Sequence, residues 1–78
     1  MLYILNASNP EQPVTGGEYN ITAFLNGGTA VVEVKKDGSD NWANIGDLPD
    51  ALEMRINLPL ASTVRLTPTG GAVVEISS

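Results

Sequence analysis

The sequence predicts a small all-β domain, an antiparallel β-sandwich or barrel-like fold of about seven short strands. Three observations lead to this prediction. Apolar and polar residues alternate in short runs along the chain. Gly-Gly, Asp-Gly and Pro signals separate these runs at intervals of roughly ten residues, as in sandwiches and barrels. None of the runs favours a helix over a strand.

The first part of the chain predicts one strand and a connection. Residues 2–5 form a short apolar run, which ends where residues 6–10 favour a turn. Residues 11–17 contain a proline, two glycines and few apolar side chains, so we expect an extended surface connection there, the most flexible segment of the chain. The chain is therefore divided into an N-terminal strand and arm, residues 1–17, and a sandwich core, residues 18–78, within a single domain.

The next two runs predict a hairpin. Residues 18–25 and 29–36 both alternate, and the Asn-Gly-Gly segment between them permits a tight turn. A slip of one residue would bring charged side chains into the core, so the register is well specified. The residues expected to face inward are Tyr19, Ile21, Ala23 and Leu25 in the first strand and Ala30, Val32 and Val34 in the second.

Four further strands complete the prediction. We expect Trp42, at the start of the first of them, to anchor the core. The second alternates Leu, Met, Ile and Leu with polar residues, which favours a strand over the helix that is its rival interpretation. A Pro-Leu-Ala-Ser connection is expected between the second and the third of these four strands. The four strands are residues 42–47, 51–58, 63–67 and 72–76, and the connection is residues 59–62.

Charge and hydropathy limit the partners. Nine acidic and four basic residues give a formal net charge of −5, and the basic residues are scattered, so nucleic acid is not an expected partner. The apolar run at residues 2–5 is too short for a signal peptide, and no run approaches the roughly 20 apolar residues of a membrane helix. We therefore expect a soluble chain with no membrane partner.

The composition also argues against catalysis. The chain has no histidine and no cysteine, so it lacks the commonest general base, the commonest metal ligand and the thiol nucleophile. Four aspartates near Trp42 suggest a calcium site or a carboxylate pair, but aspartates in turns most often bond their own backbone. We predict no enzyme activity, no cofactor and no metal. The four are Asp37, Asp40, Asp47 and Asp50.

Residues 30–42 combine a β-strand pattern, an Asp-Gly turn and Trp42, and a Leu-Pro element, a Val-Arg-Leu strand and a Gly-Gly turn follow. In this order the segments are similar to small structural proteins of tailed-phage virions, over about residues 19–76. The resemblance implies a virion component made in the host cytoplasm, a head decoration or cement protein that binds the outside of the capsid as an oligomer. It transfers no functional residue.

A domain this small has a thin core and no disulfide, so association with other chains is its expected support. The expected partners are the major capsid protein or neighbouring virion subunits. We also expect a homo-oligomer, and a trimer is the first expectation for its size. We expect residues 1–17 to make these contacts and the acidic loops at residues 37–50 to face solvent. The candidate partner-binding residues are Leu2, Tyr3, Ile4, Leu5, Pro10 and Pro13.

Two other functions stay open. A carbohydrate- or receptor-binding module of a phage tail or surface protein would use an exposed Trp42, with Tyr3 and Tyr19, to stack on sugars. A subunit of a tail or neck assembly would form rings or filaments. Both would use the same fold, so fold alone does not separate them.

Overall fold

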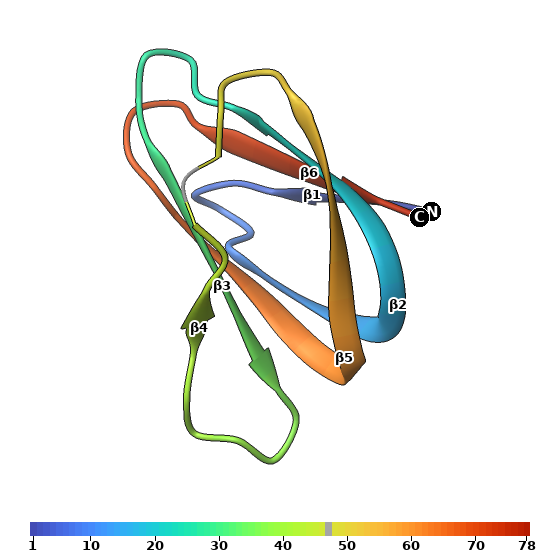
Figure 1. Cartoon of the computed structure of the whole chain (residues 1–78). Coiled ribbons are helices and arrows are strands. Elements are labelled where there is room, and N and C mark those ends of the chain that lie inside the picture. The colour runs from blue at the N-terminus through green and yellow to red at the C-terminus, as the bar shows by residue number, and fades with distance from the viewer. Residues whose placement is uncertain (47) are drawn as a thin grey trace.

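The computed structural model describes residues 1–46 and 48–78, and these residues form a single antiparallel sheet (Figure 1). Within the described ranges there are six strands and no helix, which confirms the predicted all-β class. The order across the sheet is β1-β6-β2-β5-β3-β4. The strands are β1 (Leu2–Leu5), β2 (Glu11–Phe24), β3 (Ala30–Lys36), β4 (Ala43–Asn44), β5 (Glu53–Pro68) and β6 (Val73–Ser77).

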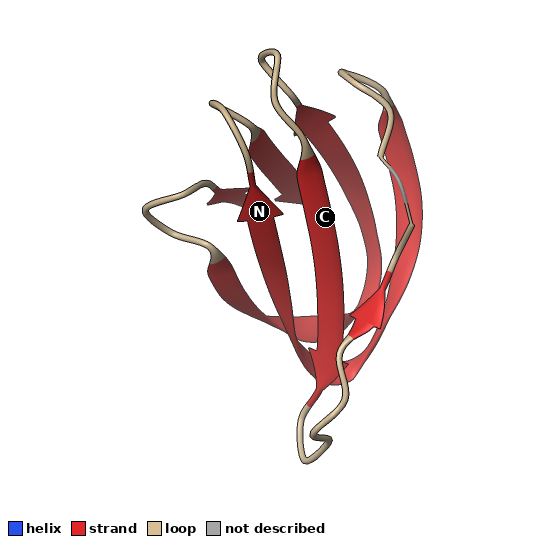
Figure 2. Cartoon of the chain, turned by 90° about the vertical axis from the view of Figure 1, so that its left-hand side faces the viewer, coloured by secondary structure: helices blue, strands red, loops and turns tan. Residues whose placement is uncertain are grey.

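Two long, bent strands turn this one sheet into two layers. Residues 17–22 of β2 pair with residues 53–58 of β5, and residues 11–15 of β2 pair with residues 61–65 of β5. The register shifts between Thr15 and Gly17, where Gly17 has a φ of 132°, a conformation that glycine adopts without strain. Both strands bend over there, so the sheet curls back toward itself (Figures 1 and 2).

We call the two halves the first and the second layer. The first layer contains β1, β6, the C-terminal half of β2 and the N-terminal half of β5. The second layer contains the other halves of β2 and β5 together with β3 and β4. The ends of the described chain meet in the first layer, where the Ser78 N–H donates to the Met1 carbonyl at 3.1 Å (Figure 2).

The hydrophobic core lies between the layers and follows the predicted alternation. Buried side chains come from every second position of each long strand, as expected for a sheet with one face in the core. The expected inward faces of β2 and β3 are confirmed. The core residues are Leu5, Val14, Tyr19, Ile21, Ala23, Val32, Val34, Leu48, Leu58, Val64, Leu66, Val74 and Ile76.

Four expectations about the elements are wrong. The predicted hairpin of residues 18–25 with residues 29–36 does not form, because β2 pairs with β5 and β6 whereas β3 pairs with β5 and β4. The connection predicted at residues 11–17 is the first half of β2, and its Val14 is in the core. The connection predicted at residues 59–62 lies within β5, so the two strands predicted around it are one strand. The strand predicted at residues 42–47 shortens to β4, and its Asp47 lies outside the described residues.

Candidate functional site

Because the sheet is open, its bent layers end in free strand edges, which are the places where another chain could pair. Among the described residues, the first layer ends at β1 and at residues 53–58 of β5. The second layer ends at residues 11–15 of β2 and at β4. An edge presents unpaired backbone N–H and C=O groups, and proteins usually protect it with charges, prolines or short length.

The second layer has protected edges. Leu66 N–H donates to the Pro10 carbonyl at 2.7 Å, which fixes the hydrogen-bonding phase of this half of β2. By alternation the backbone of Pro13 faces the free edge, where its missing N–H costs no bond of the sheet. Glu11 adds a charge to the same edge, and β4 is only two residues long. Neither edge is a ready template for pairing.

The edge of β1 has none of these protections. Its four residues are Leu2, Tyr3, Ile4 and Leu5, without a charge or a proline. Met1 and Ser78 exchange backbone bonds in both directions, at 3.1 and 3.3 Å. Antiparallel pairs alternate, so the backbone groups of Leu2 and Ile4 point away from β6 to the free edge. The Asn9 side-chain amide donates to the Ile4 carbonyl at 3.1 Å, which agrees with this phase.

The predicted partner-binding residues divide into three groups. Leu2 and Ile4 are 55% and 45% exposed and lie on the outer face of β1. Leu5 is fully buried and Tyr3 is half-buried against the core, so both belong to the inner face. Pro10 and Pro13 are exposed, but they belong to the turn before β2 and to β2 itself. The structure therefore brings Leu2 and Ile4 together as a surface and removes Leu5 from it.

The other free edge of the first layer is residues 53–58 of β5, which we call the β5 edge. Ala51 N–H donates to the Ala23 carbonyl at 2.7 Å, so alternate residues of β2 face β5 in this layer. In this phase Met54 and Ile56 bond to β2, and the backbones of the other residues point to the free edge. Those residues are Glu53, Arg55 and Asn57.

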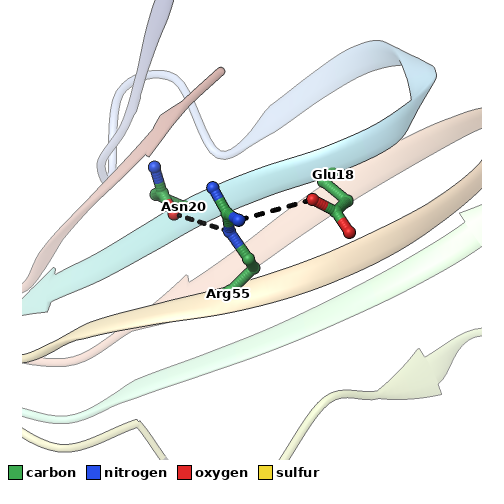
Figure 3. A network of polar contacts seen from close by, with 3 residues as sticks. All are labelled: Glu18, Asn20 and Arg55. Atoms are coloured by element: carbon green, nitrogen blue, oxygen red, sulfur yellow. Dashed lines mark hydrogen bonds and ion pairs between the residues drawn. The ribbon is translucent and has the colours of Figure 1, made fainter.

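Arg55 does not guard this edge, because its side chain is drawn back over β2 (Figure 3). Its Nη1 lies 3.5 Å from Glu18 Oε2, and its Nε donates to Asn20 Oδ1 at 3.4 Å. Both partners are on β2, on the side of β5 opposite to the free edge. The charge is held away from the backbone groups that a new strand would need.

A pocket of about 340 Å³ opens beside the β5 edge, where the two layers do not meet. Its walls are mostly apolar and come from β3, the region of β4 and β5, with Lys36 as the one charged lining residue among those described. No pattern in the sequence predicts this pocket. It is open because β4 is only two residues long and pairs with only part of β3. The lining residues are Val34, Lys36, Ser39, Asn41, Ala43, Ile45, Ile56, Asn57 and Leu58.

Trp42 is not in the core, so the expectation that it anchors the core is wrong. It lies half-buried over the outer face of the second layer, where the Arg65 guanidinium carbon is 3.9 Å from its ring centroid. Tyr19 is buried, and its hydroxyl donates to the Thr15 carbonyl at 2.6 Å. Tyr3 lies on the inner face of the first layer. The three rings do not form a common sugar-stacking surface.

The expected turn bonds of the aspartates are not what the structure gives for Asp50, which bonds a distant part of the backbone. Asp50 Oδ1 accepts a bond from Leu25 N–H at 2.9 Å. Across residues 1–46 and 48–78 no three acidic side chains gather as a metal site would require, and Asp47 falls outside these ranges. The same residues include no helix that could cross a membrane. No family model, curated protein or solved structure matches the chain.

Proposed function

We propose that this chain is a non-enzymatic structural protein of a phage virion, a head decoration protein that attaches through the outer face of β1. One observation carries the proposal. β1 is an uncharged edge strand that exposes two large apolar side chains, Leu2 and Ile4, on the same face. Large apolar side chains that lie exposed side by side are typical of a surface that binds another protein.

The expected strength of one such contact is modest. Leu2 and Ile4 are about half exposed already, so burying the remainder contributes roughly 1 kcal/mol each. Together they contribute about 2 kcal/mol, so a single contact of this size has a dissociation constant weaker than about 1 mM. Several contacts made together by an oligomer would raise the avidity by orders of magnitude, which suits a protein that covers a repeating surface.

The resemblance to virion structural proteins supports the same conclusion from the sequence. The carbohydrate-binding alternative needs an open aromatic platform, whereas one face of Trp42 is occupied by Arg65. A tail or neck subunit would use β1 in the same way. Binding to isolated heads or to isolated tails separates this function from head decoration.

The test is cosedimentation of the purified chain with empty heads assembled from the major capsid protein of the phage that encodes it. The double variant Leu2→Ser with Ile4→Ser is expected to lose binding at least tenfold. Val31→Ser is the matched control, because Val31 is 40% exposed but lies on β3, far in the strand order from β1. Failure of the wild-type chain to bind heads, or equal binding by the double variant, would overturn the proposal.

A further inference from the structure

We infer that copies of this chain assemble head to tail, with β1 of one copy paired antiparallel to the β5 edge of the next copy. The two free edges of the first layer would then hydrogen-bond to each other, and the first layers of neighbouring copies would become one continuous sheet. This inference rests on the proposed role of β1. The backbone edge of β1 takes a second copy of the chain, and the side chains of Leu2 and Ile4 on the outer face stay available to the head.

The strand directions permit this arrangement. The first layer has the order β1-β6-β2-β5, and each neighbouring pair is antiparallel. Its two end strands therefore run in opposite directions. When β1 of one copy pairs antiparallel with β5 of the next, the β1 strands of all copies point the same way. That is the condition for rotation about a single axis, so head-to-tail contacts can close into a ring.

The hydrogen-bonding phase and the faces also agree. The edge-facing backbone groups of β1 belong to Leu2 and Ile4, whose side chains lie on the outer face. The Asn9 side chain already occupies the Ile4 carbonyl, so the groups left to pair are the N–H and carbonyl of Leu2 and the N–H of Ile4. Those of the β5 edge belong to Glu53, Arg55 and Asn57, whose side chains are also exposed. Antiparallel pairing places such residues directly opposite each other with their side chains on one face. Parallel pairing would oppose outer residues to inner ones and break the continuity of the core.

The inner faces of the two edges are complementary as well. Tyr3 lies on the inner face of β1 and is half-buried in its own copy. Met54 and Ile56 lie on the inner face of the β5 edge and are half-buried although they point between the layers. Ile56 lines the open pocket. Pairing of β1 with this edge would bring Tyr3 beside both side chains and cover the mouth of the pocket.

Charge and buried area favour this pairing over symmetric ones. The uncharged β1 brings no like charge to Glu53 or Arg55, whereas two β5 edges paired about a central Arg55 would oppose that residue to its own copy. Two β1 strands would match in charge, but four residues span only about 13 Å. Such a pair would leave the pocket and the β5 edge open, whereas head-to-tail pairing covers both. The ring gives every copy two interfaces.

The chain has no cysteine, so engineered cysteines report contacts between copies directly. Two registers keep the faces matched, one with Ile4 opposite Arg55 and one with Leu2 opposite Arg55. We would oxidise the double variants Ile4→Cys with Arg55→Cys and Leu2→Cys with Arg55→Cys. The control is Val31→Cys with Arg55→Cys, which has a cysteine of similar exposure on β3.

On a denaturing gel, at least one β1–β5 double variant is expected to give a ladder of covalent species that stops at the ring size. The control and each single variant should remain single chains. Dimers from single β1 variants would overturn the inference in favour of β1–β1 pairing, and single chains throughout would overturn it outright. Binding to heads is measured separately. A ladder without head binding would refute only the proposed function, and head binding that depends on Leu2 and Ile4 without a ladder would refute only the ring.

Discussion

The Arg65 guanidinium carbon lies 3.9 Å from the centroid of the Trp42 ring, and the same guanidinium forms a 2.7 Å ion pair with Glu33. Arg65 and Glu33 are direct partners on β5 and β3, and Lys35 Nζ is 5.5 Å from the ring centroid. The tryptophan therefore covers a cross-strand ion pair on the outside of the sheet. This contact joins the loop before β4 to the second layer.

Replacing Trp42 should therefore have a small effect on stability. We expect Trp42→Leu to lower the free energy of unfolding by about 1 kcal/mol, because a partly exposed cation–π contact is worth that much. Urea unfolding followed by circular dichroism measures the change. Loss of a tryptophan from a core costs about 3–5 kcal/mol, and a loss of that size would contradict the placement of Trp42 outside the core.

The two ion pairs of the outer face should differ in their contribution. Arg65 and Glu33 are 33% and 24% exposed at the side chain, whereas Arg55 and Glu18 are 68% and 65% exposed. We expect Glu33→Gln to cost about 1 kcal/mol and Glu18→Gln less than about 0.5 kcal/mol, because exposed pairs are screened by solvent. The free energy of unfolding of both variants, measured at low and at high salt, would show this difference. Equal losses would contradict the packing described for Arg65.

A close contact between two turns predicts an intolerant glycine. A Cβ on Gly28 would lie 1.8 Å from the Thr69 carbonyl oxygen, whereas a Cβ on Gly71 would have its nearest neighbour at 3.7 Å. The Thr29 and Thr69 hydroxyls, 2.7 Å apart, hold the two turns together. We expect Gly28→Ala to lower the melting temperature strongly and Gly71→Ala to change it little. Similar melting temperatures for the two variants would mean that the turns do not pack this closely.

Leu5 and Leu2 provide a matched test of the two faces of β1. Leu5 is fully buried and Leu2 is 55% exposed. We expect Leu5→Ala to destabilise the fold by about 2–5 kcal/mol, because truncation of a buried leucine removes apolar contacts and leaves a cavity. Leu2→Ala should cost less than about 1 kcal/mol. Chemical denaturation of both variants would decide, and equal effects would refute the assignment of faces.

The fold class and most inward faces could be predicted because alternation is local information. In β2 and β3 the pattern marked Ile21 and Val32 as core, and both are fully buried. Residues 2–5 are all apolar, so no alternation separated Leu5, which is in the core, from Leu2 and Ile4 on the surface. The face of β1 is set by its pairing with β6 at the other end of the chain.

Proline and glycine at residues 11–17 are typical of a connection, but here they lie within a strand. Pro13 is tolerated because its nitrogen faces a free edge, and Gly17 lies at the bend of β2. Trp42 could not be placed from sequence, because its contact with Arg65 depends on the register of β3 and β5. The β5 edge could not be placed either, because it is free only where β3 pairs with residues 62–68 of β5 and leaves residues 53–58 unpaired on that side.

The most direct test of the central claim, that the β1 edge joins copies of the chain, is the molar mass in solution of the wild type and of Leu2→Lys. Light scattering during size-exclusion chromatography measures both. We predict that the wild type is a closed oligomer, with three copies expected first, and that a lysine at the exposed position 2 reduces it to a folded single chain. A wild-type monomer at high concentration, or an oligomer that the lysine leaves unchanged, would contradict the account.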